Sequence, residues 1–147
     1  MLQLVKVDPS NDDWRAGLAD VEVRLGTAEQ GLGKADGAAL STKGVATLKE
    51  MGQKHSDTVF ILDMEIDALL TARPIALRDP KLAVEVAEHE VLLTRRHEPR
   101  ALLSLAEAYR AEGRIEEAHA AAREGLALLL PGTPHSCTRT LLNLAAK

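Results

Sequence analysis

The residues that come closest to a catalytic or metal-binding pattern are histidines. His89-Glu90 has the opening of a helical zinc-protease motif, in which a second histidine follows four residues after the first, but Leu93 stands at that position. The stretch His135-Ser136-Cys137 offers two metal ligands, which are too few for a site, so it is interpreted as a surface turn. The sequence therefore predicts no catalytic residue, no metal site and no cofactor.

Glycines gather in a second stretch of potential chemical interest, residues 31–37, which read GLGKADG. Glycine-rich loops that hold phosphates follow a strand, and none is expected here. The spacing matches neither a Walker loop nor a dinucleotide fingerprint. The stretch is interpreted as the turn of a helix hairpin, with phosphate binding as the alternative.

The one cationic cluster is Arg95-Arg96-His97 together with Arg100. Two interpretations remain open. The cluster could be a solvated loop whose charge complements the carboxyl end of the preceding helix. Alternatively, Arg95 and Arg96 could be a docking point for an acidic segment of a partner.

Helices are the elements that would position these residues, and the clearest pattern lies in residues 99–130. One apolar stripe at helical spacing is formed by Leu102, Leu105, Ala106 and Tyr109. Gly113 then interrupts the helix at a position that favours a left-handed residue. A second stripe contains the small residues Ala118, Ala122 and Gly125, which let two helix backbones approach closely. Residues 99–130 are therefore expected to form a helix hairpin.

The remaining chain is expected to repeat this unit within one domain, 1–147, because 147 residues suffice for one core. The predicted segments are the end of a preceding unit at 1–11, a first hairpin at 12–53, a second hairpin at 56–94 with an extended turn at 73–80, the third hairpin at 99–130, and a capping helix at 134–147. The first helix of the first hairpin, from Asp12 to about Gln30, is expected to carry one apolar face, formed by Trp14, Leu18, Val21, Leu25 and Ala28. A frayed tail is the alternative to the capping helix. The prediction is an all-α fold of six or seven helices.

A family resemblance follows from these residues. The order Leu102-x2-Leu105-Ala106-x2-Tyr109, then Gly113 and Ala118, resembles a tetratricopeptide repeat. The chain departs from the family pattern at Leu102, where a tryptophan is common, and at Ala122, where an aromatic residue is common. The resemblance implies a stack of antiparallel helix hairpins, an α-solenoid, that offers a surface to a partner.

The linker RDP before AVEVAE, followed by LAEAY, is similar to tetratricopeptide-like segments of large bacterial multidomain proteins, including C-terminal regions of some serine/threonine kinases. This similarity implies that the chain is part of, or derived from, a larger bacterial protein. No kinase motif occurs in these residues.

Composition restricts the class of partner. The net charge is −4 and no basic stripe is present, which argues against nucleic acid. No apolar stretch approaches a membrane-spanning length, and Lys6 and Asp8 lie where a signal peptide would need its apolar core. A cytoplasmic location without membrane contact is expected.

The expected function is a non-catalytic interaction module that binds a protein or peptide. The resemblance implies a groove lined by the first helices of each pair, and in the third hairpin its residues would be Arg100, Leu103, Ser104, Glu107 and Arg110. Because Leu103 and Glu107 stand where a carboxylate clamp needs cationic or amide groups, a helix or an extended segment is the expected ligand.

Two alternatives remain. The first is a homo-oligomerisation domain, a homodimer formed through the N-terminal apolar residues Leu2, Leu4, Val5 and Trp14. The second, from another class, is an enzyme that uses the groove.

Overall fold

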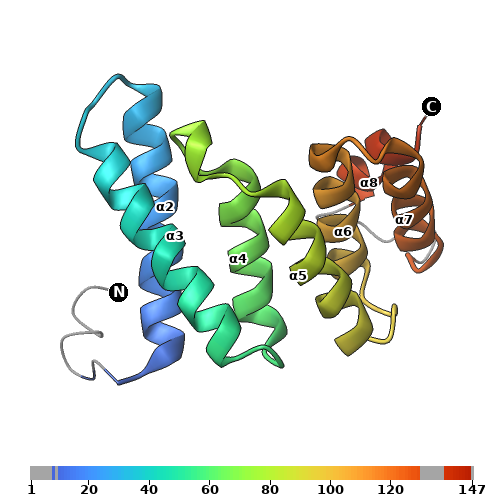
Figure 1. The fold of residues 1–147 in the computed structure, drawn as a ribbon. Helices are drawn as coiled ribbons and strands as arrows, with labels where there is room; N and C mark the ends of the chain where they lie inside the picture. Colours follow the sequence, from blue (N-terminus) through green and yellow to red (C-terminus); the bar gives the residue numbers. More distant parts are fainter. Residues whose placement is uncertain (1–7, 9, 130–137, 147) are drawn as a thin grey trace. The chain divides into compact units, whose positions relative to one another are not determined.

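The computed structural model describes residue 8 and residues 10–129 and 138–146. These residues form seven α-helices and one short 3-10 helix, and contain no strand (Figure 1). The all-helical class predicted from the sequence is confirmed. The contacts between Cα atoms divide the chain into two compact units, Met1–Asp79 and Pro80–Lys147.

The boundary between the units falls at the end of the extended turn expected at 73–80, inside the second hairpin expected at 56–94. The pairing of that hairpin stays a prediction, as does the continuous solenoid. The expectations for Leu2, Leu4, Val5 and for His135-Ser136-Cys137 lie outside the described residues.

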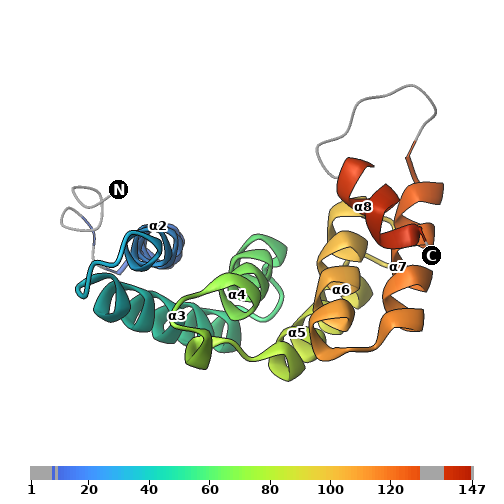
Figure 2. The same ribbon diagram turned by 90° about the horizontal axis from the view of Figure 1, so that it is seen from above.

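The first unit contains α2 (Asp12–Gly31), α3 (Gly37–Lys54) and α4 (Val59–Thr71), followed by the 3-10 helix η1 (Ile75–Leu77). Helices α2 and α3 run antiparallel side by side in the range expected for the first hairpin, and α4 packs against both (Figures 1 and 2). Asn11 begins α2 as its N-cap, since its side-chain oxygen accepts the backbone N–H of Trp14 at 3.0 Å. The core consists of Ala16, Ala19, Val23, Val45, Leu48, Met51, Ile61, Ala68 and Ala72.

Helices α2 and α3 approach each other through glycines. A Cβ atom on Gly44 would lie 2.6 Å from the carbonyl oxygen of Ala19 in α2. A Cβ on Gly26 would likewise collide with the carbonyl oxygen of Gly37 and with Ser41 in α3. The low helix propensity of these glycines is therefore offset by close backbone packing.

The apolar face expected for α2 is not the face that packs into the core, although Trp14 and Leu18 are half-buried. Val21 is 46% exposed and Leu25 48% exposed, whereas Ala16 and Ala19 are 0% and 1% exposed. The physical reason is that Gly26 of α2 and Gly44 of α3 bring the two helices into backbone contact on the side of α2 that carries Ala16, Ala19 and Val23, so this side turns inward. Val21 and Leu25 remain outside.

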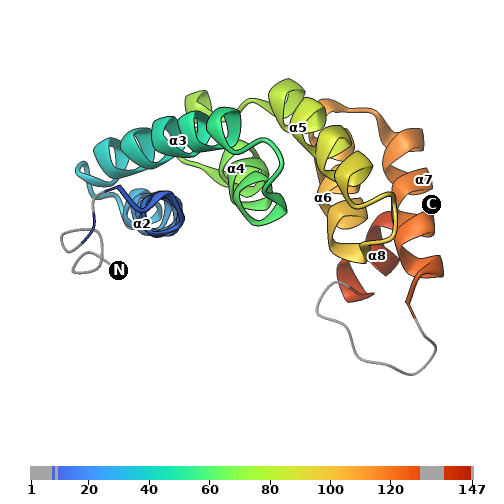
Figure 3. The same ribbon diagram turned by 90° about the horizontal axis from the view of Figure 1, so that it is seen from below.

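The second unit contains α5 (Pro80–Leu93), α6 (Pro99–Glu112), α7 (Ile115–Ala127) and α8 (Thr138–Ala145). Helix α6 contacts α5, α7 and α8 (Figures 2 and 3). Gly113 ends α6 with φ 86°, as the sequence indicates, and the turn brings α7 back along α6. Gly125 lies against Leu102 of α6 and Leu141 of α8, so the three helices meet at this small residue.

Within the described residues, no helix combines the length and the apolar character needed to cross a lipid bilayer.

Candidate functional site

A surface hollow of about 270 Å³ lies between α5 and α6 in the second unit. Its walls are formed by Glu88, Leu92, Arg96, Leu105 and Tyr109, which we call the Tyr109 hollow. Glu88 and Leu92 lie four residues apart and share one side of α5. Arg96 follows in the turn after α5, which brings it to the same hollow. Leu92 is 70% exposed and supplies an apolar side chain at the edge of the hollow.

Tyr109 is held in place by polar contacts. Its hydroxyl donates a hydrogen bond to Glu88 Oε1 at 2.7 Å, and the guanidinium of Arg114 lies 4.3 Å from the ring centroid. Burial and the hydrogen bond to Glu88 raise the pKa of Tyr109 to about 12. The hydroxyl therefore stays protonated at neutral pH and acts as a hydrogen-bond donor.

Arg96 closes another side of the hollow through a two-pronged ion pair with Glu124 of α7. Its Nε atom lies 2.6 Å from Glu124 Oε1, and its second nitrogen contacts Oε2. This hydrogen bonding lowers the pKa of Glu124 and raises that of Arg96. The hollow is thus bordered by charged pairs that are already formed within the chain.

Of the cationic cluster in the sequence, Arg95, Arg96 and His97 lie in the turn after α5, and Arg100 lies in α6. Arg95 and Arg96 both adopt left-handed backbone conformations, with φ 51° and 57°, and the N–H of Arg96 donates to the carbonyl of Val91 at 2.9 Å. Arg96 is committed to Glu124, whereas the side chain of Arg95 is exposed. Docking of an acidic segment at these two residues stays a prediction.

The groove residues expected on α6 are only partly at the surface. Leu103 and Ser104 are 6% and 5% exposed, because α6 is enclosed by its neighbouring helices α5, α7 and α8. These two residues present almost no surface to a partner, which corrects the expected groove. Arg100 and Arg110 are exposed and Glu107 is half-buried, and their contact with a partner stays a prediction.

Sequence reasoning missed the residues of the Tyr109 hollow, apart from Arg96. The apolar spacing that includes Leu105 and Tyr109 indicates a buried stripe, and nothing in that pattern indicates a surface site on α5. The four-residue spacing of Glu88, Leu92 and Arg96 was the available signal.

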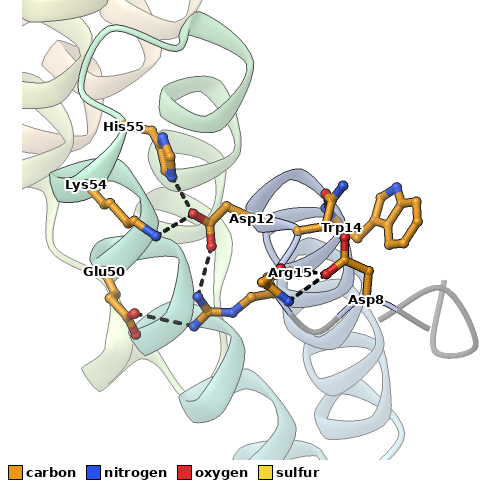
Figure 4. A network of polar contacts seen from close by, with 9 residues as sticks. Asp8, Asp12, Trp14, Arg15, Glu50, Lys54 and His55 are labelled. Atoms are coloured by element: carbon orange, nitrogen blue, oxygen red, sulfur yellow. Dashed lines mark hydrogen bonds and ion pairs between the residues drawn. The ribbon is translucent and has the colours of Figure 1, made fainter. Parts of the chain in front are cut away.

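The first unit carries a polar network between the start of α2 and the end of α3 (Figure 4). Asp12 at the start of α2 accepts Lys54 Nζ at 2.5 Å, lies 2.8 Å from His55 Nε2 and accepts Arg15 at 3.0 Å. Arg15 in turn contacts Glu50 at 3.3 Å. The hydrogen bonds from Lys54 and His55 hold the pKa of Asp12 well below its usual range, so this network clamps the start of α2 to the end of α3.

A second hollow of about 200 Å³ lies between α2 and α3, beside this network. Arg15, Leu18, Glu22 and Lys43 contribute to its walls, and Lys43 Nζ lies 2.6 Å from Glu22 Oε1. Among the residues that the structure describes, no group of three or more His, Cys, Asp or Glu is placed to hold a metal ion.

Comparisons with protein-family models, with curated proteins and with solved structures found no match to this chain.

Proposed function

We propose that this chain is a non-catalytic protein–protein interaction module whose α5–α6 surface accepts a helix or an extended segment of a partner. The observation that carries the proposal is the Tyr109 hollow, where an exposed leucine lies beside a tyrosine fixed by hydrogen bonding and a paired arginine. Tyrosine and arginine are the residue types most often found at the energetic centre of protein interfaces.

The chemistry of the hollow favours binding over reaction. Tyr109 and Arg96 both have raised pKa values, so they remain protonated near pH 7 and do not accept protons. Glu88 accepts a hydrogen bond from the Tyr109 hydroxyl, and Glu124 accepts hydrogen bonds from Arg96. These groups can orient a partner's polar atoms without a large rearrangement.

The expected ligand has one apolar side chain that covers Leu92 and enters the hollow, and polar groups on either side. An amphipathic helix or an extended peptide meets this requirement. The hollow of about 270 Å³ offers space for such an apolar side chain. The tetratricopeptide resemblance supports the same proposal, and a cytoplasmic role within a larger bacterial protein is proposed from that resemblance.

A peptide-display selection on the purified chain tests the proposal. Peptides that carry an apolar anchor should be enriched, and Leu92→Asp should weaken their binding about tenfold or more, because the aspartate exposes a charge to the anchor. Ile115→Asp is the matched control, since Ile115 is also an exposed aliphatic residue in the second unit and does not line the hollow. Equal binding to the Leu92→Asp variant and the wild type would refute the proposed site.

A further inference from the structure

The exposed face of α2 carries an apolar stripe with the spacing of a coiled-coil seam. Its members are Trp14, Leu18, Val21, Leu25 and Ala28, separated alternately by four and three residues. Val21 and Leu25 are 46% and 48% exposed, and Ala28 is also exposed. Trp14 and Leu18 are half-buried, and Leu18 also contributes to the hollow between α2 and α3. Trp14 points away from the contacts between α2 and α3 (Figure 4). The small residues on the opposite side of α2 already bury against α3, so the stripe is a second, separate packing face.

We propose that a second copy of this chain packs on the stripe, with the two α2 helices antiparallel about a two-fold axis. A two-fold axis requires a surface that complements itself. With the axis placed midway between Val21 and Leu25, Val21 of one copy faces Leu25 of the other. Leu18 then faces Ala28, so a larger side chain meets a smaller one, and Trp14 faces Leu32, which is 76% exposed.

Charges beside the stripe have opposite sign in this register. Arg15 and Glu29 lie on the same side of the seam, and the antiparallel arrangement brings Arg15 of one copy opposite Glu29 of the other. Within its own copy Arg15 already pairs with Asp12 and Glu50, and Glu29 with Lys34, so the contact between copies extends existing ion pairs and adds little to affinity.

Two positions face their own copy with like charge. Glu22 lies midway between Arg15 and Glu29, is 9% exposed and is paired with Lys43 of its own copy at 2.6 Å. Arg24 lies on the other side of the seam near the two-fold axis. Its charge is already balanced by Asp20 at 2.9 Å and by Asp67 of α4 at 3.0 Å, so the repulsion between two copies is reduced.

The size of the face limits the strength of the dimer. Helix α2 has 20 residues and is therefore about 30 Å long, and a helix face about 10 Å wide gives roughly 300 Å² per partner. Stable complexes bury about 800 Å² per partner. The dimer is consequently weak and forms in a concentration-dependent way.

Sedimentation velocity over a range of protein concentration tests the interface. The wild type should shift from monomer to dimer as concentration rises, and Leu25→Glu should raise the dissociation constant by about tenfold or more. Ile115→Glu is the control, because Ile115 is 45% exposed, nearly the same as Val21, but lies in α7. A wild type that remains monomeric, or an equal effect of Ile115→Glu, would overturn the proposal. Helical content measured by circular dichroism shows that each variant is folded.

Cross-linking tests the register. In a Cys137→Ser background, Val21→Cys mixed with Leu25→Cys should give more dimer with a short bismaleimide than either variant alone at the same total concentration. If each variant alone cross-links as well as the mixture, the antiparallel register is wrong. Cross-linking tests dimer formation through α2 in the first unit, whereas the peptide selection tests binding at Leu92 in the second unit. Failure of one proposal is therefore distinguishable from failure of the other.

Discussion

The carboxylate of Glu65 in α4 occupies the space that a side chain at position 52 would fill. A Cβ atom on Gly52 of α3 would collide with Glu65 Oε2, and Glu65 is only 4% exposed. The absence of a side chain at Gly52 in α3 thus makes room for the buried carboxyl group of Glu65 in α4.

Gly52→Ala should therefore destabilise the first unit by about 1–2 kcal/mol, because the overpacking outweighs the gain in helix propensity. Trp14 is the only tryptophan of the chain and lies in α2, so its fluorescence in urea follows the unfolding of this unit. Gly31→Ala is the control, since a Cβ there meets nothing within 4 Å. In a Glu65→Ala background the cost of Gly52→Ala should disappear. An unchanged cost would contradict the contact.

The stability of the first unit should fall as pH rises from about 4.5 to 7. Burial raises the pKa of Glu65 from 4.5 to about 7, so the folded state holds a proton that the unfolded state has already released. The free energy of unfolding decreases across this window by up to roughly 3 kcal/mol. The free energy of unfolding of Glu65→Gln, relative to that of the wild type, should therefore be higher at pH 8 than at pH 5, as measured by urea unfolding. A difference that does not depend on pH would show that Glu65 titrates normally.

Asp12→Asn should destabilise the first unit more than Asp13→Asn does. Both residues lie in the first turn of α2, so both substitutions remove a charge that favours the helix N-terminus. Asp12 alone of the two makes hydrogen bonds to Lys54 and His55 at the end of α3. Because the pKa of Asp12 is lowered from 3.8, its contribution is present above that pH and is lost as pH falls below it. Thermal unfolding at pH 7 and pH 3 measures the effect, and equal midpoints for the two variants would refute the clamp.

Arg95→Gly should give a second unit about 1 kcal/mol more stable than Arg95→Ala. Both substitutions remove the charge, but only glycine adopts φ 51° without steric cost. Hydrogen exchange of α5 and α6 amides compares the two variants. Faster exchange in the glycine variant would contradict the left-handed turn.

The local signals in the sequence were sufficient for the helices themselves. Gly113 ended α6 with a positive φ, Pro99 began it, and Asn11 preceded α2 as its cap, because turn and cap chemistry depend on residues that are close in the chain. The all-α class followed from the same local periodicity.

The faces of the helices were decided by tertiary structure. Both sides of α2 have helical spacing, and periodicity alone favoured the larger side chains of Val21 and Leu25 for the interior. Gly44 of α3, which comes later in the chain, instead packs on the side of α2 that carries Ala19 and Val23. On α6, Leu103 and Ser104 were expected at a groove, but helices on several sides enclose them. Which face is buried depends on the shape of the neighbour, and that shape is set by residues distant in sequence.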